Sequence, residues 1–427
     1  MSGTGTPPGI LIVTDVYPPV AGGSGWSTHA LVQALLERGH RVEVMEVDAT
    51  SEGEQLREHD GVAVAGIGVA GARKSLRRRL GADDYATQRV GEAVASRLAR
   101  EPQLQVVHGQ HLHSAPGAIR AARQAGRAAV VTLRDYWPVC LHGTSWWGDN
   151  HCPGCTTARL TGCMHEVYGL PRPASLALVP WARRRLDARR TAVASAHRII
   201  AVSESVRGLI IDRAPELRID VVPNMVDPGR SAAAAERGAE RDLPGGYLLA
   251  AGKLNAAKGF DRIVDELAAA GCSRPLVVAG EGPANAGMRE RAAALGIELV
   301  LCGWVGGDDL LRMMRDARAV VLPSAWAEPL SRVLLEALSV GTPVIARRSG
   351  GSAEAIDDGV NGWLIDSRES LAQALEQLDD AVQWQEARAA ARRIVAERFV
   401  PEVVYPRLER LYREAIAAGD SQAERPA

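Results

Sequence analysis

Two lysines in one short loop are the first residues in this sequence whose type and spacing suggest chemistry. The chain contains 50 basic residues, but its only lysines are Lys74, Lys253 and Lys258. The last two lie five positions apart in the stretch AGKLNAAKGF. An ammonium group is a compact point charge that suits a phosphate oxygen, whereas arginine presents a planar fork. The loop therefore predicts a phosphate site, and the alternative is a solvated loop that kept two lysines by chance.

A second candidate anion site lies in PSAWAEPLSRVLLEALSVGTPVIA, which begins at Pro323. A strand is predicted to end at Pro323, and Glu328 and Pro329 are predicted to open a helix that runs to Gly341. Proline is favoured in the first turn, because its missing N–H would have no helical partner there. Backbone N–H groups at a helix start bind anions. Here the predicted donors are Leu330, Ser331 and Arg332.

Two glutamates mark the same predicted helix. Glu328 and Glu336 are eight residues apart, which corresponds to about 12 Å along a helix axis. This span suits one carboxylate on a sugar and the other on a ribose, with a diphosphate held between them. The alternative is a capping acid and a surface glutamate.

Four of the six cysteines fall within one segment of 24 residues, CLHGTSWWGDNHCPGCTTARLTGC. The spacing C-x2-C is typical of a zinc knuckle, and two further cysteines could complete a tetrahedral set. Such a zinc would be structural, because four protein ligands leave no open position for a substrate. Free buried thiols are the alternative. The predicted ligands are Cys140, Cys152, Cys155 and Cys163, with His142, His151 and His165 as alternative ligands.

The elements that must position these residues alternate between apolar strands and helices. In the first half the predicted strands are ILIVT, RVEVMEV, QVVH, AAVVTL and RIIAVS. In the second half they are YLLAAG, PLVVAG, ELVLCG, AVVLPS and PVIAR. This alternation predicts an α/β protein with parallel sheets covered by helices on both faces. Two doubly wound, Rossmann-like domains are expected to face each other across a cleft, where ligands of open α/β sheets bind.

The domain boundaries follow from where the alternation loosens. Residues 1–230 are predicted to form the first domain, with a cysteine-rich insert at about 140–165. The stretch PNMVDPGRSAAAAERGAERDLPGG is interpreted as a linker. Residues 231–399 are predicted to form the second domain, residues 400–417 a helix that returns toward the first domain, and residues 418–427 a disordered tail.

Composition excludes several classes of function. The net charge of −1 and an aromatic content of 4% argue against nucleic-acid binding. The N-terminus does not resemble a secretory signal, and no apolar run approaches the ~18 residues of a membrane span. A soluble cytoplasmic protein is expected. Two basic stretches, Arg73–Arg79 and Trp181–Arg190, suggest weak peripheral contact with an anionic membrane, although a solvated face is the usual explanation of such runs.

Taken together, the motifs of the second half resemble glycosyltransferase family 4, the retaining nucleotide-sugar transferases with a GT-B fold. The two glutamates match the family's E-x7-E motif, and AAGKLNAAKGF resembles its G-R-L-x-x-x-K-G-F loop. The resemblance implies that Lys253 and Lys258 hold the donor diphosphate. Lys253 stands where the family more often has arginine. VVAGEGP, LCGWV and RRSGGSAEAIDDGVNGWLID follow the family's order as well.

The first half resembles the family less sharply. YPPVAGGSG is similar to the loop after the first strand, whose glycines, here Gly22 and Gly23, approach donor and acceptor. GQHLH resembles a segment in which a histidine contacts the transferred sugar. His108 and His111 are both candidates, and His111 is favoured. TLRDYW carries Arg134 where the family usually has histidine, and cysteines after DYW resemble a subfamily insert.

The resemblance implies a retaining glycosyltransferase, of the hexosyl or a related type, that acts in the biosynthesis of polysaccharides, glycolipids or other glycoconjugates. Glu328, Lys258, Lys253 and His111 would be the catalytic residues, and Glu336 would hold the ribose. A nucleotide diphosphate sugar is the expected donor, and a sugar, a lipid-linked compound or a small molecule the expected acceptor. No metal or other cofactor is implied for catalysis.

Three alternatives remain open. One is a nucleotide-sugar epimerase of the same fold, and another is a non-catalytic protein that binds sugar nucleotides or zinc. The third is a nicotinamide dehydrogenase, which DVYPPVAGGSG argues against because it lacks G-x-G-x-x-G directly after the strand.

Overall fold

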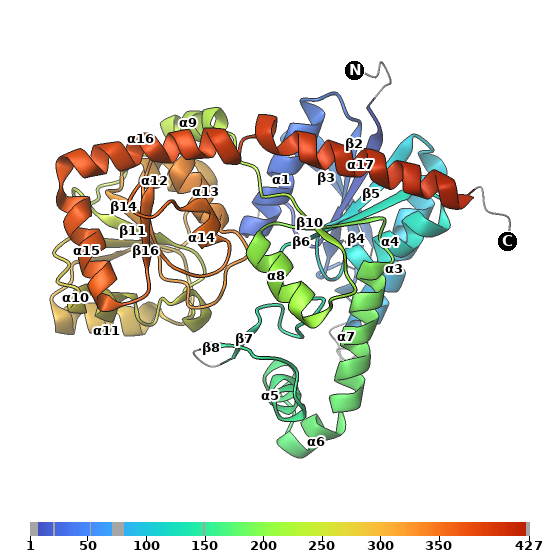
Figure 1. Ribbon diagram of the computed structural model, residues 1–427, viewed down its shortest axis with the longest axis horizontal. Helices are drawn as coiled ribbons and strands as arrows, with labels where there is room; N and C mark the ends of the chain where they lie inside the picture. Colours follow the sequence, from blue (N-terminus) through green and yellow to red (C-terminus); the bar gives the residue numbers. More distant parts are fainter. Residues whose placement is uncertain (1–6, 20–21, 52, 71–80, 148–149, 424–427) are drawn as a thin grey trace. The chain divides into compact units, whose positions relative to one another are not determined.

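The computed structural model describes residues 7–19, 22–51, 53–70, 81–147 and 150–423 (Figure 1). The chain divides into two compact units. The first unit comprises Met1–Ser145, Pro153–Pro223 and Tyr405–Ala427, and the second comprises Trp146–Cys152 and Asn224–Val404. The domain boundary was predicted at residue 230, and in the structure the two units divide between Pro223 and Asn224.

The first unit is built on an eight-stranded sheet with the order β10-β9-β6-β5-β1-β2-β4-β3. All neighbouring strands are parallel except β3 and β4, which form an antiparallel hairpin at one edge. Strands β1 and β6 are buried along their whole length, as central strands of a covered parallel sheet must be. The strands are β1 (Gly9–Thr14), β2 (Val42–Asp48), β3 (Glu54–His59), β4 (Val62–Gly68), β5 (Leu104–Gly109), β6 (Ala128–Leu133), β9 (Arg198–Ala201) and β10 (Ile219–Val221).

Helices connect these strands and cover the sheet. They are α1 (Gly23–Leu36), α3 (Ala82–Arg100), α4 (Ala115–Gln124), α5 (Thr157–Tyr168), α6 (Arg172–Ala177), α7 (Val179–Ala194) and α8 (Glu204–Arg213). The C-terminal helix α17 (Pro401–Ala423) supplies residues from Tyr405 onward to this unit. There Tyr412 Oη lies 2.8 Å from Nδ1 of His108, a buried side chain of β5. The helix also runs six residues beyond its predicted end at 417, while residues 424–427 lie outside the described part of the chain.

The second unit contains a six-stranded parallel sheet with the order β13-β12-β11-β14-β15-β16. Its apolar core lies between this sheet and the helices that flank it. The strands are β11 (Leu248–Ala251), β12 (Leu276–Ala279), β13 (Leu299–Leu301), β14 (Ala319–Leu322), β15 (Val344–Arg347) and β16 (Gly362–Ile365). A small hairpin of β7 (Trp146–Trp147) and β8 (Asn150–His151) also belongs to this unit.

The helices of the second unit follow its strands in regular alternation. They are α9 (Pro228–Arg237), the 3-10 helix η2 (Ala256–Lys258), α10 (Ile263–Ala269), α11 (Asn285–Leu295), α12 (Gly307–Asp316), α13 (Arg332–Ser339), α14 (Ser352–Ala355), α15 (Arg368–Asp379) and α16 (Ala381–Arg398). The predicted α/β class with two doubly wound halves is therefore confirmed, and so are all ten strands predicted from apolar runs.

The predicted linker is wrong in its main part, because it contains helix α9. Asp227 caps the helix by accepting hydrogen bonds from the backbone N–H groups of Gly229 and Arg230. An alanine-rich segment behind such a cap is a good helix former. The chain after the helix packs so closely on α12 that a Cβ at Gly238 would lie 2.4 Å from the Asp308 carbonyl oxygen. This segment is therefore an integral part of the second unit.

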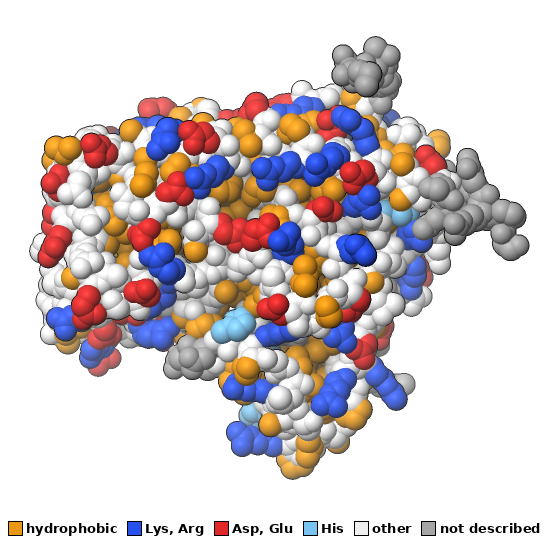
Figure 2. All heavy atoms as spheres, in the orientation of Figure 1, with side chains coloured by type: hydrophobic (Ala, Val, Ile, Leu, Met, Phe, Trp, Pro, Cys, Tyr) orange, Lys and Arg blue, Asp and Glu red, His pale blue; other side chains and the backbone are white. Residues whose placement is uncertain are grey.

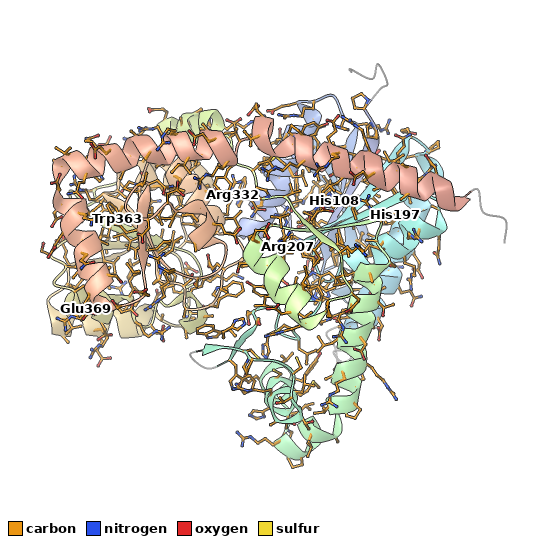
Figure 3. The ribbon with its side chains drawn as sticks, viewed as in Figure 1. His108, His197, Arg207, Arg332, Trp363 and Glu369 are labelled. Atoms are coloured by element: carbon orange, nitrogen blue, oxygen red, sulfur yellow. The ribbon has the colours of Figure 1, made fainter. Side chains whose placement is uncertain are left out.

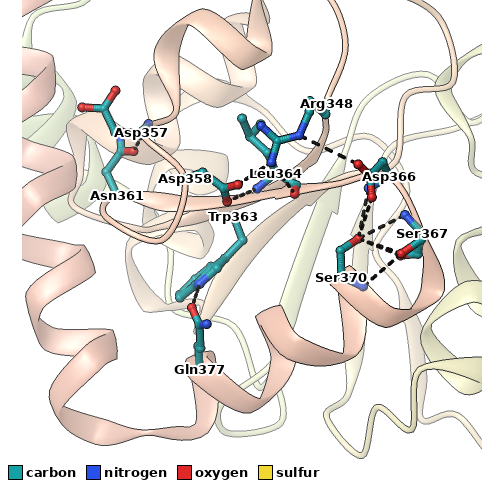
Figure 4. Close-up of polar contacts among 10 residues, drawn as sticks. All are labelled: Arg348, Asp357, Asp358, Asn361, Trp363, Leu364, Asp366, Ser367, Ser370 and Gln377. Atoms are coloured by element: carbon teal, nitrogen blue, oxygen red, sulfur yellow. Dashed lines mark hydrogen bonds and ion pairs between the residues drawn. The ribbon is translucent and has the colours of Figure 1, made fainter.

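Strand β16 was not predicted because turn residues precede a run of only four apolar ones. Side chains of the turn fix the strand (Figure 4). Asn361 Oδ1 accepts a hydrogen bond from the Asp357 backbone N–H (2.8 Å), and Asp358 Oδ1 accepts one from Leu364 (2.9 Å). Trp363 Nε1 donates to Gln377 Oε1 of α15 (2.5 Å). These bonds lock the turn and the last strand onto the sheet.

Two features concern the predicted cellular location of the protein: the distribution of charge on its surface and the composition of its helices. Acidic and basic side chains are interspersed over the face drawn in Figure 2, in keeping with the net charge of −1. Among the described residues, no helix combines the length and the apolar composition that crossing a bilayer requires.

Of the two basic stretches, only Trp181–Arg190 lies among the described residues. All of Arg73–Arg79 falls in residues 71–80, outside the described residues. In Trp181–Arg190, Arg185 and Arg189 are buried and form ion pairs with Asp83 at 2.7 and 2.8 Å. Two of the charges in that run therefore serve the interior of the first unit, and membrane contact stays a prediction.

Candidate functional site

Each sheet has one point where the strand order reverses, and ligands of open α/β sheets bind beside such points. In the second unit the reversal lies between β11 and β14, which pair in parallel. The loops that follow these two strands leave the same edge of the sheet side by side. One of them carries both lysines, and the other carries Glu328.

The lysine loop is shaped by one side-chain cap and one glycine. Asn255 Oδ1 accepts a hydrogen bond from the Lys258 backbone N–H (3.0 Å), which starts the short helix η2. Gly259 ends it with φ of 74°, and a Cβ there would lie 1.9 Å from the Pro323 carbonyl oxygen. Only glycine fits this left-handed position at such close approach. The loop after β14 is thereby held against the lysine loop.

Lys258 and Glu328 form an ion pair in this structure. The Glu328 side chain is almost fully buried, and its Oε1 also accepts a hydrogen bond from Ser324 Oγ (2.9 Å). Burial by itself would raise the pKa of Glu328, but the Lys258 ammonium and the hydrogen bonds outweigh it, so that the pKa lies below its usual value. The Lys258 ammonium lies 5.5 Å from the Trp326 ring centroid, within cation–π range. Glu328 is therefore an ionised acceptor of hydrogen bonds.

Lys253 differs from Lys258 in its surroundings. Its side chain is exposed, whereas Lys258 is partly buried. The structure thus brings Lys258 to a buried carboxylate and leaves Lys253 at the rim of the same loop. Their assignment to one diphosphate stays a prediction.

The predicted helix start at Glu328 is wrong by several residues. Helix α13 begins at Arg332, and Ser331 is its N-cap, with Oγ accepting from the Leu334 backbone N–H (3.4 Å). Serine is a strong capping residue, whereas the Glu328 side chain is already engaged by Lys258. The distance of 12 Å along a helix axis therefore does not apply to the two glutamates.

The three predicted backbone donors are divided by this cap. Ser331 and Arg332 lie at the helix start, but Leu330 precedes it and is buried, with its carbonyl accepting from Asn224 Nδ2 (3.3 Å). An anion site at this end would therefore use the first turn of α13 rather than the chain before it.

Glu336 lies one turn into α13 and is held by an arginine. Arg332 Nε donates to Glu336 Oε1 at 2.7 Å, and Arg332 Nη1 donates to the Met225 carbonyl at 2.7 Å (Arg332 is labelled in Figure 3). Both side chains are largely buried. The arrangement fixes one carboxylate oxygen of Glu336 and leaves the other oxygen for a ligand. The sequence predicted the backbone role of Arg332 but not this side-chain role.

Two glycines pack against the backbone at Glu328 and Pro329, and this packing role was not predicted from the sequence. Gly350 has φ of 61°, and a Cβ there would lie 2.3 Å from the Glu328 carbonyl oxygen. A Cβ at Gly351 would lie 1.9 Å from the Pro329 carbonyl oxygen, and Gly351 N–H donates to Glu328 O at 2.7 Å. The doublet in RRSGGSAEA was the available signal.

In the first unit the strand order reverses between β1 and β5, and the loops after these strands meet at His111. His111 Nδ1 accepts from the Asp15 backbone N–H (3.4 Å) and lies 3.1 Å from Thr14 Oγ1. In a neutral ring Nε2 therefore carries the proton. Burial lowers the pKa of His111 to about 4, so the ring is neutral near pH 7. Nε2 is buried and has no hydrogen-bond partner among the residues described, which leaves one donor for a ligand.

His108 is the other histidine of the segment, and both of its nitrogens are engaged. Nε2 lies 2.8 Å from Thr132 Oγ1, and Nδ1 lies 2.8 Å from Tyr412 Oη (His108 is labelled in Figure 3). Burial lowers the pKa of His108 to about 3. His108 is a satisfied core residue, and the geometry favours His111 as the ligand-facing histidine.

Gln110 is a partner of Arg134, which stands where the family usually has histidine. Gln110 Oε1 accepts from Arg134 Nε at 3.1 Å and from Nη2 at 2.8 Å. Gln110 is fully buried, so a guanidinium fixes its orientation at the same end of the sheet.

Two aspartates complete this part of the first unit. Asp15 accepts from the backbone N–H groups of His113 (3.0 Å) and Ser114 (2.7 Å) at the start of α4. Asp135 Oδ1 accepts from the Trp137 backbone N–H at 2.7 Å. Burial, reinforced by the charge of Asp15, raises the pKa of Asp135 to about 7. Asp135 is a carboxyl group that titrates near neutral pH.

The loop before α1 has room at Gly22. Gly22 is the N-cap of α1, and a Cβ there would meet no heavy atom within 4 Å. Internal packing does not demand glycine at Gly22, which is compatible with space kept for a ligand. Gly23 is the first residue of the helix.

The cysteines give the zinc prediction no geometric support. Cys140, Cys152 and Cys163 are buried, and Cys155 is partly exposed. Within the described residues, the group of three or more potential ligands with mutual spacing under 4.8 Å is His29, His59 and Asp60, and no cysteine belongs to it. Zinc binding by the cysteines therefore stays a prediction.

Comparison with known proteins agrees with this geometry. The model of Glycosyltransferase Family 4 matches residues 21–230, and that of Glycosyl transferases group 1 matches residues 236–396. The chain is 27% identical over 417 residues to a D-inositol 3-phosphate glycosyltransferase of Paenarthrobacter aurescens, covering 93% of this chain and 94% of the relative. It is also 27% identical over 408 residues to a glycogen synthase of Mycobacterium tuberculosis, covering 91% and 90%.

Among solved structures, Anabaena HepE in complex with UDP matches with a TM-score of 0.63 and 16% identity, covering 94% of this chain and 98% of that one. Two Rossmann-like units with these loops define a GT-B glycosyltransferase. The chain belongs to glycosyltransferase family 4, as the motifs of its second half indicated, and it is a transferase.

Proposed function

We propose that this enzyme transfers a sugar, with retention of the anomeric configuration, from a nucleotide diphosphate sugar to an acceptor hydroxyl. The observation that carries the proposal is the Lys258–Glu328 pair at the strand-order reversal of the second unit. An ammonium has three N–H donors. Lys258 can therefore keep Glu328 ionised and still bind a phosphate oxygen.

The residues would divide the donor between them. Lys258, Lys253 and the first turn of α13 hold the diphosphate, and Glu328 accepts hydrogen bonds from sugar hydroxyls. Glu336, fixed by Arg332, accepts hydrogen bonds from the ribose. His111 donates its Nε2–H to the transferred sugar, with Gly22 and Gly23 leaving space beside it. The contribution of the protein is mainly electrostatic, because charge grows on the leaving diphosphate as the glycosidic bond breaks.

Retention would follow from the direction of attack. The acceptor hydroxyl approaches from the face that the diphosphate leaves, and a phosphate oxygen takes its proton. No described side chain needs to act as a nucleophile in this scheme. The ionised Glu328 is committed to Lys258 and Ser324, which suits orientation of a sugar better than attack on it.

The acceptor and the cellular location are the finer parts of the proposal. The relatives above are named for an inositol phosphate and for glycogen, so a phosphorylated cyclitol and a glucan are the first acceptors to test, followed by lipid-linked sugars. We place the reaction in the cytoplasm. Peripheral membrane contact would be supported if a lipid-linked sugar proves to be the acceptor.

The test has two stages. Thermal unfolding against a panel of nucleotide sugars identifies the donor, since a ligand at 100 times its Kd adds roughly 2.7 kcal/mol of stability. Transfer of that sugar to the acceptor panel is then followed by mass spectrometry, and the anomeric configuration by NMR. A stabilising donor that is epimerised instead of transferred would support the epimerase, and tight binding without any turnover would support a binding protein.

A further inference from the structure

A cluster of two histidines and one aspartate lies in the first unit, and none of these three residues takes part in the proposed function. His29 comes from α1, while His59 ends β3 and Asp60 begins the turn to β4. Their ligand atoms all lie within 4.8 Å of one another. The two imidazole rings have centroids 5.2 Å apart and are inclined by 65°. Three metal-binding side chains from two separate elements therefore converge.

The distances suit a single ion between the side chains. His29 Nε2 lies 3.2 Å from Asp60 Oδ2, and His59 Nε2 lies 3.8 Å from the same oxygen. Ligands bound at 2.0–2.2 Å to a tetrahedral zinc ion are separated by about 3.3–3.6 Å. The second distance is too long for a hydrogen bond but close to that of two ligands sharing a metal. Small side-chain movements would reach the metal geometry.

Polar atoms without partners point to a missing ligand here. His59 Nε2 and Tyr17 Oη are both buried and have no hydrogen-bond partner in the described part of the chain. Tyr17 is 1% exposed, and its ring packs edge-on against His29 and His59 at centroid distances of 5.7 and 6.3 Å. Buried polar atoms normally find partners, so two such atoms on neighbouring rings need an explanation.

The backbone at the turn is adapted to hold the carboxylate in place. Asp60 has φ of 48°, a left-handed conformation that few residues other than glycine adopt, and Gly61 follows with φ of 75°. Aspartate and asparagine tolerate this conformation better than other side chains. The turn thereby places Asp60 across from His29.

We propose that His29, His59 and Asp60 bind one divalent transition metal ion of the zinc class. Two imidazoles and a carboxylate are a borderline ligand set that suits zinc and its first-row neighbours. Three protein ligands leave one position for water. The ion joins the β3–β4 hairpin to α1.

This hairpin also shapes the loop after β1. Arg57 of β3 donates to the carbonyl oxygens of Pro18 (2.5 Å) and Tyr17 (3.1 Å), and Glu46 accepts from the Tyr17 backbone N–H (2.7 Å). One face of the hairpin therefore holds the start of the loop that ends at Gly22, and the metal fastens the same hairpin to the helix that follows. The role is structural and does not depend on the proposed reaction.

Cobalt(II) is the probe that tests the site on the full chain. Chelator-treated protein is titrated with Co²⁺, and the absorbance and the tryptophan fluorescence are recorded. We expect one equivalent to bind without a thiolate-to-metal charge-transfer band, because no cysteine takes part. Trp26 has its ring centroid 5.6 Å from His29 and 5.9 Å from His59, so bound cobalt should quench its emission. A thiolate band at the first equivalent would assign the metal to the cysteines and overturn the proposal.

Variants locate the ion. His59→Gln and Asp60→Asn each remove one ligand, and His113→Gln removes a more exposed histidine outside the cluster. Loss of an outer-shell partner alone weakens metal binding by about 10–100-fold, so loss of a direct ligand should weaken it by at least about 100-fold. His113→Gln should bind as the unaltered chain does. Equal unfolding temperatures of the metal-free proteins show that the variants fold, and zinc should raise that temperature only where the ligands are intact. Unchanged affinity in both ligand variants, or no uptake by the unaltered chain, would refute the site.

Discussion

The two strand-order reversals of this molecule share a scaffold and differ in chemistry. In both units the loops after the two strands at the reversal come together, at His111 in the first and at Lys258 and Glu328 in the second. The second unit places an ion pair there, in which a buried carboxylate is kept charged. The first unit places a neutral imidazole with one unused N–H. The fold provides the position, and the side chains decide whether that position acts through charge or through a directed hydrogen bond.

The largest effect is expected from removing Lys258, which forms the ion pair at the strand-order reversal of the second unit. Lys258→Ala should lower kcat/KM by about 10²–10³-fold, as expected for loss of one electrostatic stabiliser of the leaving group. It should also destabilise the fold by about 3–5 kcal/mol, because Glu328 is left buried without its partner. Steady-state kinetics and denaturant unfolding measure the two effects.

A double variant separates the two consequences. Lys258→Ala combined with Glu328→Gln should recover much of the stability, since no buried charge remains, while turnover stays low. Lys253→Ala is the matched control for an exposed lysine of the same loop and should lose less activity. Normal turnover of Lys258→Ala at saturating donor would contradict the phosphate assignment.

Substitution of His111, at the strand-order reversal of the first unit, should have a smaller effect on activity. We also expect no titration of activity near pH 6.5. His111→Ala removes one hydrogen bond to the transferred sugar and should lower kcat by about 10–10²-fold, at or below the lower end of the about 10²–10³-fold loss seen for a single preorganised donor to a developing charge. The pKa of His111 is lowered to about 4, so kcat/KM of the unaltered enzyme should show no step from this residue between pH 5 and 8. His108→Asn is the control, and it should cost stability while sparing turnover per folded molecule. A histidine step near pH 6.5 that disappears in His111→Ala would refute the neutral state.

A third prediction concerns Asp135, the carboxyl group of the first unit whose pKa is raised. Burial raises the pKa of Asp135 to about 7, compared with about 3.9 in an unfolded chain. Its stabilising contribution is therefore fully present below about pH 4 and is lost as the pH rises through 7, at most about 4 kcal/mol. Asp135→Asn keeps an acceptor for the Trp137 N–H and should raise the free energy of unfolding at pH 8 more than at pH 5. An equal shift at both values would mean that Asp135 does not titrate in this range.

The smallest effect on activity is expected at Glu336, which lies on α13 of the second unit and is assigned to the ribose. Glu336→Gln should raise the donor KM by about 10-fold and leave kcat unchanged, the pattern of lost uniform binding. The amide oxygen can still accept from Arg332 Nε, so the local structure should persist. A fall in kcat equal to that of Lys258→Ala would show that Glu336 acts on the reacting bond.

How far the sequence could predict this molecule depended on the kind of signal at each element. The ten predicted strands were found because each contains several apolar residues in a short run. Edge strand β3, EQLREH, was missed because it is mostly polar, whereas the apolar run VAVAGIG of β4 was an available signal. The start of α13 was misplaced because Pro329 suits a first turn, whereas Ser331 takes the capping role through its hydroxyl.

The candidate site was predictable in its residue types but not in its pairings. The spacing of Lys258 and Glu328 along the chain does not state that they meet, since that follows from the order of β11 and β14 in the sheet. The choice between His108 and His111 likewise depended on Thr132 and Tyr412, which lie 24 and 304 residues away from His108. Contacts over such separations have no local signal in the sequence.

The return of α17 to the first unit has a consequence for how the protein is made. Chains are synthesised from the N-terminus, and domains usually fold as they emerge. Here the first unit cannot be completed in that order, because Tyr405 and Tyr412 supply hydrogen-bond partners to His40 and His108 only after the whole second unit has been translated. A nascent chain that has reached residue 400 still lacks the tyrosine partners of His40 and His108. Residues that are translated after the second unit therefore complete the packing of the first.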